Sequence, residues 1–387
     1  MKAIKKWQRA AAVLGALTLA LTACGGTDAT TGSEEPAAGT DTDTDAGTDT
    51  DTDAGTDTDT DTDTGDGGES AAGADWCDDT DVTESIVVGI NNPNYATQLA
   101  VVLADEKGYF AEQGITDVEI IETDEYIAGL IGGSLTIAQG DTDVTFGSAD
   151  ASGEDLVYLG TYRNGEYQIM GTAPGIENPE DLIGQPVTGG DLEGRNTSLM
   201  RKFLQELGVD PDEVEFVPMG GNSDARLQAV MQGTVKAASL FPRHKVPLEE
   251  AGGKFMYEEF EVNPQEGVIV MGDTLENDCA TVIAYMTADL MARRDMYDFS
   301  LKDEHLEIMR SRGFEIPDFF EEVYQIEVEQ VGETAGFDVA EMDELVQEMI
   351  ELGELPEGLD WRQYVDLRPL HTAQEALGIE PEPASLD

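Results

Sequence analysis

Residues 86–110 read IVVGINNPNYATQLAVVLADEKGYF and indicate the fold class of the chain. The first five of them form a short apolar run that is typical of a buried strand. The next four are turn-forming residues, and the stretch from Tyr95 to Glu106 then carries apolar residues at helical spacing until Gly108 ends it. A strand, a loop and a helix in this order are the first step of an α/β fold.

The same alternation continues along the next forty residues. The pattern predicts a strand at 118–121, a helix at 127–139 and a third strand at 144–147. Parallel strands joined through helices require right-handed crossovers. The first unit is therefore predicted to be β-α-β-α-β.

A second unit of the same kind begins near residue 178. Strands are predicted at 185–188, 214–217 and 237–241, with helices at 197–207 and 223–232 between them. The repetition predicts two lobes, each with its own parallel strands.

The rest of the chain indicates a return to the first lobe. Residues 267–271 form one more apolar run, and the pattern is mostly helical from there to about residue 377. We expect the chain to cross between lobes twice, near residues 172 and 265. The predicted divisions are a signal peptide at 1–23, a tether at 24–75, a first part of lobe 1 at 84–172, lobe 2 at 173–264, and the completion of lobe 1 with a helical C-terminal portion at 265–387.

The N-terminus has the pattern of an export signal. Four basic residues precede an apolar segment, 10–21, that is too short to span a bilayer. Leu21-Thr22-Ala23-Cys24 then resembles the bacterial lipobox, whose cysteine is lipidated and becomes the new N-terminus. We expect Cys24 to anchor the protein to the outer face of the cell membrane.

The chain is very acidic, with 81 acidic and 21 basic residues and a formal net charge of −60. This balance argues against binding to nucleic acid. Residues 27–75, rich in Asp-Thr repeats, hold nothing that can build a core and are predicted to be a disordered tether. From Glu69 onward there are still 67 acidic against 17 basic residues. Because salt screens such repulsion, we hypothesise a saline habitat and a halophilic protein.

Two further cysteines, Cys77 and Cys279, remain in a compartment where disulfides persist. Either they pair, which would fasten the start of the body to a segment about 200 residues later, or they are two buried free thiols. The sequence leaves both possibilities open.

Four segments resemble one family in its order along the chain. They are KGYFAEQG at 107–114, QGDTDV at 139–144, IENPEDLIGQPV at 176–187 and RLQAVMQGTVKAA at 226–238. They are similar to segments of the periplasmic binding proteins for sulfonates, taurine, nitrate and the pyrimidine precursor of thiamine. The resemblance implies a two-lobed, periplasmic-binding-protein-like (type II) α/β fold.

The same resemblance implies a function. Such a protein captures a small-molecule ligand between its lobes and delivers it to the permease and ATPase subunits of an ABC importer. We expect a monomer that is not an enzyme and uses no metal or cofactor. A ligand-sensing protein that feeds a membrane receptor would have the same body, so this alternative stays open.

The expected ligand residues follow the carboxyl ends of the predicted strands, where ligands of α/β sheets bind. In order along the chain they are Asn92, Asn94, Tyr95, Tyr126, Ser148, Asp150, Arg195, Asn196, Thr197, Asn222 and Phe241. Arg195 is favoured if the ligand is an anion, because it stands at a predicted helix start. A surface Arg paired with Glu193 is the simpler interpretation, and the tyrosines are as well explained by core packing. The sequence does not identify the ligand.

Catalytic motifs are not found. The chain has three histidines, and it lacks the Gly-x-Ser-x-Gly, His-Glu-x-x-His, phosphate-loop and dinucleotide patterns. A fungal pyrimidine-precursor synthase resembles these binding proteins, but its cysteine-rich signature has no counterpart here. An enzyme of the same fold is therefore the less favoured alternative.

Overall fold

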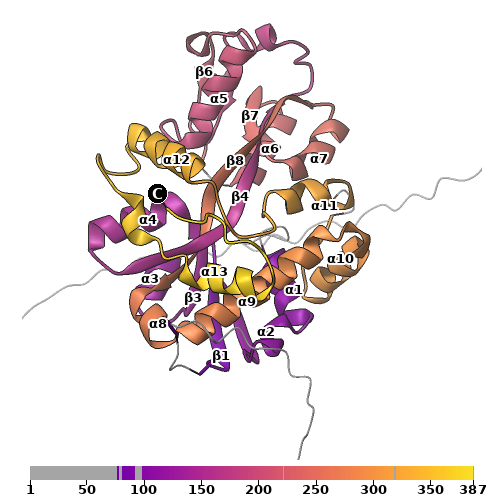
Figure 1. The fold of residues 1–387 in the computed structure, drawn as a ribbon. Coiled ribbons are helices and arrows are strands. Elements are labelled where there is room, and N and C mark those ends of the chain that lie inside the picture. Colours follow the sequence, from indigo (N-terminus) through magenta and orange to yellow (C-terminus); the bar gives the residue numbers. More distant parts are fainter. Residues whose placement is uncertain (1–75, 78–80, 92–97, 221, 318–319, 387) are drawn as a thin grey trace, which may run out of the picture. The chain divides into compact units, whose positions relative to one another are not determined.

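The computed structural model describes most of the chain after residue 75 (Figure 1). The described residues are 76–77, 81–91, 98–220, 222–317 and 320–386. Every described residue belongs to one compact unit, Asp66–Asp387. Outside the described residues lie the predicted signal peptide, Cys24, the tether up to residue 75, Asn92, Asn94 and Tyr95.

All eight strands of the described residues belong to one sheet, in the order β2-β1-β3-β8-β4-β7-β5-β6. The strands are β1 (Ser85–Ile90), β2 (Asp117–Glu122), β3 (Ile137–Asp141), β4 (Leu156–Thr172), β5 (Pro186–Thr188), β6 (Glu215–Phe216), β7 (Ala237–Leu240) and β8 (Lys254–Met271). β1 is parallel to β2 and β3, and β5 is parallel to β6 and β7. The predicted repetition of a parallel unit is confirmed.

An antiparallel pair of long strands joins the two parallel groups. β4 has 17 residues and β8 has 18, and they pair from Leu156 opposite Met271 to Thr172 opposite Lys254 (Figure 1). The sequence did not predict that these segments are continuous strands. Their pairing shifts register several times between Tyr158 and Gly165, so the ladder is irregular in the region between the two groups.

The strand register also shows where the parallel groups end. β3 is antiparallel to β8, and its last residue, Asp141, lies opposite Glu266. β7 is antiparallel to β4, and its last residue, Leu240, lies opposite Ile169. Both carboxyl ends therefore point toward the middle of the β4–β8 pair, from opposite sides.

The helices cover the sheet and form most of the chain after residue 271, as the sequence predicted (Figure 1). They are α1 (Leu99–Glu106), α2 (Tyr109–Glu112), α3 (Tyr126–Ile131), α4 (Thr142–Ser152), α5 (Arg195–Glu206), α6 (Ser223–Met231), α7 (Lys245–Glu250), α8 (Gly272–Asn277), α9 (Cys279–Tyr297), α10 (Lys302–Ser311), α11 (Phe320–Glu329), α12 (Val339–Leu352) and α13 (Arg368–Ala376).

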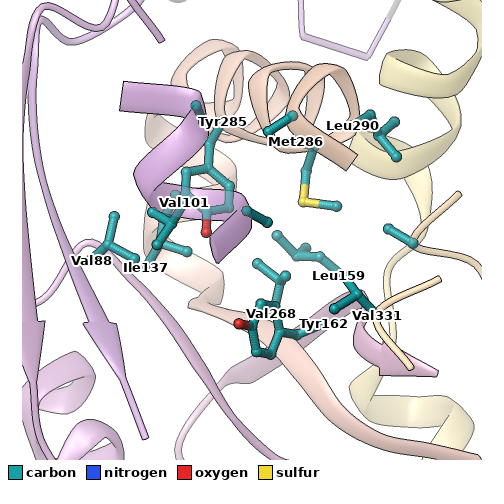
Figure 2. Close-up of a cluster of buried hydrophobic side chains, with 14 of the residues drawn as sticks. Val88, Val101, Ile137, Leu159, Tyr162, Val268, Tyr285, Met286, Leu290 and Val331 are labelled. Atoms are coloured by element: carbon teal, nitrogen blue, oxygen red, sulfur yellow. The ribbon is translucent and has the colours of Figure 1, made fainter. Parts of the chain in front are cut away.

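Two separate hydrophobic cores support the two parallel groups. The larger core packs α1, α9 and the C-terminal helices on β1, β3 and one end of the long strands. Figure 2 shows part of it, with Tyr285, Met286 and Leu290 of α9 near Val268 of β8 and Leu159 of β4. The smaller core packs α5 and α6 on β5, β7 and the other end of the long strands. Each lobe thus buries apolar surface of its own.

The prediction of a strand at 144–147 was wrong, and the helix predicted at 127–139 is confirmed only in its first part, α3. β3 occupies Ile137–Asp141, and the predicted strand lies inside helix α4. The buried residues of α4 are Thr142, Thr145, Phe146 and Ala149, which is helical spacing rather than alternation. The β-branched and aromatic residues Val144, Thr145 and Phe146 mimic a short strand when only composition is considered.

Cys77 and Cys279 are joined as a disulfide with a Cα–Cα distance of 5.9 Å across 202 residues. Both are buried in a small cluster with Ala280 and Ile283 at the start of α9. Among the described residues, no helix combines the length and apolar character needed to cross a bilayer.

Candidate functional site

A cavity of about 170 Å³ lies where β5 and β6 end and α5 begins. Loops at the carboxyl ends of parallel strands are where α/β folds bind ligands. The lining residues are Gly189, Gly190, Asp191, Gly194, Arg195, Asn196, Met219, Gly220 and Arg226. All of them belong to the second parallel group and its helices.

A glycine loop forms one wall of this cavity. A Cβ atom on Gly189 would lie 2.4 Å from the backbone nitrogen of Thr197, so only glycine lets the start of α5 approach so closely. Gly190 has φ +112°, which side-chain-bearing residues rarely adopt. The two glycines thus bring the end of β5 against the first turn of α5.

The first turn of α5 offers hydrogen-bond donors. Gly194 precedes the helix and provides no side-chain cap. The amides of Thr197 and Ser198 bond to the carbonyl of Gly194, whereas those of Arg195 and Asn196 have no partner among the described residues. Free N–H groups and the positive end of the helix dipole favour an anion or a carbonyl oxygen here.

Arg226 is a cation in the cavity wall that the sequence analysis missed. Its side chain is only 6% exposed, and its Nε donates to the carbonyl of Ser239 at 2.9 Å. Within the described residues no carboxylate oxygen lies within 4 Å of its guanidinium. Burial, and after it the charge of Arg243, lowers the pKa of Arg226. A charge that is buried without a counterion is costly, and such charges are frequent at binding sites.

Arg195, the residue favoured from sequence, has three carboxylate partners instead. Its Nη1 lies 3.2 Å from Glu166, its Nη2 lies 3.0 Å from Glu261, and its Nε lies 3.2 Å from Glu348. Burial lowers its pKa, but the three carboxylates outweigh burial and raise it. Its guanidinium is thus occupied by protein groups, and the predicted pairing with Glu193 is not what the structure shows.

The partners of Arg195 come from both sides of the molecule. Glu166 and Glu261 lie opposite each other in the middle of β4 and β8. Glu348 belongs to α12, which packs in the larger core, whereas α5 packs in the smaller core. The Arg195 cluster, defined as Arg195, Glu166, Glu261 and Glu348, therefore links the two cores next to the cavity.

The other predicted residues of the second group have different surroundings. Asn196 lines the cavity and accepts a hydrogen bond from the Ser239 hydroxyl at 3.2 Å. Thr197 is buried and donates to the carbonyl of Asp191. Asn222 caps α6 by accepting from the amide of Ala225, and half-buried Phe241 contacts the guanidinium of Arg243. Of the predicted residues that the structure describes, Arg195 and Asn196 alone line the cavity.

In the first group, Tyr126 has a supporting role. It is buried, and its hydroxyl accepts from the amide of Asp141 at 3.1 Å. Its ring fills the space beside Gly140, where a Cβ would approach within 2.4 Å. Ser148 and Asp150 lie on α4 rather than on a loop after a strand, because the predicted strand is a helix. Asp150 is exposed and accepts a hydrogen bond from the Tyr364 hydroxyl.

The end of β3 carries carboxylates that the sequence analysis did not select. Asp141 ends the strand and accepts a hydrogen bond from the side-chain amide of Asn91 at 2.5 Å. Burial raises its pKa, and the nearby carboxylates of Glu266 and Asp143 raise it further. Burial also raises the pKa of Asp143 and of Glu266. Carboxyl groups perturbed in this way often mark functional regions.

A metal centre has no support in the described part of the chain. No group of His, Cys, Asp and Glu side chains suited to a metal ion is found there. The cavity lining offers helix-start amides, an amide side chain, two arginines and the carboxylate of Asp191, which are groups that can hydrogen-bond to a solute.

Comparison with known families and structures identifies the class. The family model described as "NMT1/THI5 like" matches residues 95–298, which is more than half of the chain. The chain therefore belongs to the NMT1/THI5-like family, and the resemblance noted in its sequence is confirmed. No curated protein sequence matches the chain.

Several solved structures share the fold at low sequence identity. The periplasmic aliphatic sulphonate binding protein SsuA from Escherichia coli is 17% identical, with 73% of this chain and 97% of that chain covered and a TM-score of 0.55. The periplasmic nitrate-binding protein NrtA from Synechocystis PCC 6803 is 13% identical, with 76% and 89% covered and a TM-score of 0.56. The Candida albicans CA3427 gene product, described as having the generic periplasmic binding protein fold, is 14% identical, with 79% and 99% covered and a TM-score of 0.53.

These likenesses establish the fold. The chain has the two-lobed, periplasmic-binding-protein-like α/β fold with a helical C-terminal portion, as the sequence predicted. The named neighbours are mostly binding proteins rather than enzymes.

Proposed function

We propose that the chain is the extracytoplasmic solute-binding component of an ABC importer. The observation that carries this proposal is the convergence of both parallel groups on the middle of the β4–β8 pair, with a cavity at the end of one group. A solute that touches both groups is held by two lobes, which the long strands β4 and β8 join. The family and its fold neighbours support this function.

The mechanism follows from the two cores. A solute first occupies the cavity beside α5, and the other lobe then approaches by bending of β4 and β8 where their pairing is irregular. Glu348 of α12 reaches Arg195 when the lobes are close, which stabilises the bound arrangement. The lobes in this proposal are residues 84–172 with 265–387, and residues 173–264.

Delivery and attachment complete the proposal. A lipid on Cys24 would hold the protein at the outer face of the cell membrane, and the acidic segment to residue 75 would act as its tether. The permease and ATPase subunits of the importer would receive the solute from a monomeric protein. The excess of acidic residues suits a saline medium, where salt screens their repulsion.

A thermal-shift screen at high salt tests solute binding. The panel contains alkanesulfonates, taurine, nitrate, pyrimidines and polyamines, and a solute present at about 100 times its Kd adds about 2.7 kcal/mol to stability. Asn196→Ala, inside the cavity, should reduce the shift that the solute causes. Asn222→Ala, at the start of α6 outside the cavity lining, should not reduce it.

Small-angle scattering of the same samples tests closure. The solute that raises the melting temperature should also make the protein more compact. A panel without any binder, or a binder that leaves the scattering unchanged, argues against the proposed function.

A further inference from the structure

A segment of the C-terminal portion lies along β4 where the two long strands pair irregularly. This segment, residues 330–336, connects α11 to α12 and is called the brace. The amide of Asn164 donates to the carbonyl of Gln330 at 3.0 Å, and the amide of Thr161 donates to the carbonyl of Ala335 at 2.8 Å. The pairing of β4 with β8 shifts register across the same part of β4. The brace therefore supplies backbone hydrogen bonds where the regular ladder is interrupted.

The brace is fastened to the larger core through α9. The guanidinium of Arg293 is buried, and its Nη1 donates to the carbonyls of Val331 at 2.9 Å and Gly332 at 3.1 Å. Its Nη2 donates to the carbonyl of Thr161 at 3.0 Å. Figure 2 shows Val331 in the same apolar cluster as Leu159 of β4. One arginine thus holds the brace and the adjoining part of β4 against the same helix.

The side chain of Gln330 extends this contact beyond the irregular pairing. It is buried, and its Oε1 accepts from Nη2 of Arg163 at 2.7 Å and from the amide of Tyr167 at 3.2 Å. Arg163 is also paired with Glu266 of β8 at 3.4 Å. Tyr167 packs against the smaller core, whereas Val331, the neighbour of Gln330, belongs to the larger core. A single side chain therefore connects the two cores.

We propose that Gln330 is a hinge lock, which holds the two lobes close together and releases the amide of Tyr167 when they separate. The proposal rests on the proposed function and names an element that regulates its closure. The pairing shifts register between Arg163 and Gly165, and the long strands can bend there. Because the brace keeps Gln330 with the larger core, such a bend moves the amide of Tyr167 away from Oε1.

The other contacts of Gln330 make the lock reversible. Its Nε2 donates to Oε2 of Glu327 at 2.9 Å, so the side chain stays in position when Tyr167 leaves. Losing one or two net hydrogen bonds changes an equilibrium constant by about 5- to 30-fold. This contribution biases the lobes toward the close arrangement without preventing their separation.

Pulsed electron spin resonance on the full chain, without solute, tests the proposal. Spin labels replace exposed Glu193, just before α5, and exposed Glu351 of α12, so that each lies beside a different core. Attachment through keto side chains rather than cysteines leaves the disulfide intact. Gln330→Met has a side chain of similar size without the acceptor. In this variant the ratio of long to short distances should rise by about 5- to 30-fold.

Gln325→Met is the matched control. It makes the same substitution on α11, where the side chain of Gln325 is exposed and donates to Glu329 at 2.7 Å. Its ratio of long to short distances should stay within about twofold of wild type. A ratio for Gln330→Met that is equally close to wild type overturns the proposal.

The wild-type chain provides a test that does not depend on the folding of the variant. The amide of Tyr167 has Gln330 as its acceptor, so it should exchange with solvent at least about tenfold more slowly than in an unfolded peptide. Exchange at the unfolded rate contradicts the lock. Neither measurement uses a solute, so a contradicted lock leaves the proposed function standing. A solute panel without any binder contradicts the proposed function, and the distances then still decide whether Gln330 holds the cores together.

Discussion

The two groups of parallel strands end in opposite electrostatic surroundings. At the end of β3, Asp141 lies near Glu266 and Asp143, and the pKa values of these three carboxyl groups are raised. At the end of β5, a glycine loop, the start of α5 and the buried side chain of Arg226 line a cavity. The topology of the two groups is the same, and both ends point toward the middle of the long strands. Topology therefore positions the two ends, while a few local residues decide which charge each one attracts.

The largest loss of stability should follow from breaking the Arg195 cluster, which lies between the ends of the two parallel groups. Replacing Arg195 by Met removes the cation that is paired with the buried carboxylate of Glu166, whereas Glu261 keeps its ion pair with Lys202. Removing one partner of a buried ion pair costs about 3–5 kcal/mol, and we expect urea denaturation to show a loss of this size. Arg201→Met, which breaks a long surface pair and a contact with Phe216, should cost at most about 1 kcal/mol. Equal losses in the two variants would mean that Arg195 does not hold the carboxylates.

The stability of the lobe that holds the cavity should depend on pH through His244. Burial lowers the pKa of His244 to about 4 from 6.5. Its Nδ1 accepts from the amide of Phe241, so Nε2 carries the proton toward Asp224. As the pH falls from 6.5 toward 4, His244 becomes protonated in the unfolded chain but stays neutral in the folded chain. The free energy of unfolding therefore decreases over this range.

The variant His244→Gln isolates this contribution. Between pH 7 and pH 4.5 the wild type should lose about 2–3 kcal/mol more of its unfolding free energy than the variant does. Urea denaturation at a series of pH values measures the difference. Parallel curves for the two proteins would show that His244 is not buried in its neutral form.

At the end of β3, Asp141 should change the stability with pH in the opposite direction from His244. Because the pKa of Asp141 is raised in the folded chain, Asp141 loses its proton at lower pH in the unfolded chain than in the folded chain. This group therefore lowers the free energy of unfolding above about pH 4. Asp141→Asn should increase the unfolding free energy by about 1–2 kcal/mol at pH 8 and have almost no effect at pH 4. Asp124→Asn, an exposed residue of the preceding loop, serves as the control. A loss of stability in Asp141→Asn at pH 8 would contradict the raised pKa.

The sequence predicted the repeated units well because their signals are local. Apolar runs, helical spacing and helix-ending glycines occur within short segments such as 86–110. β4 was not predicted, because Arg163, Asn164 and Glu166 interrupt its apolar pattern where the strand passes between the lobes. The strand at 137–141 was misplaced because α4 carries residues with strong strand preference on its buried face.

The site was less predictable than the fold because its contacts are distant in sequence. The helix start at Arg195 was visible, but its three carboxylates come from β4, β8 and α12. Arg226 lies on α6 and resembles any other polar residue of an amphipathic helix until the packing of α6 is known. The pair of glycines after β5 was the one local signal for the cavity, since such loops precede helix starts that bind anions.

Amide hydrogen exchange, with and without the tightest-binding member of the solute panel, tests the central claim most directly. If a solute is held between the two strand ends, its addition should slow exchange at residues 189–197 and at residues 141–146 together. Protection at one of these segments alone, or only at segments remote from both, would contradict the account.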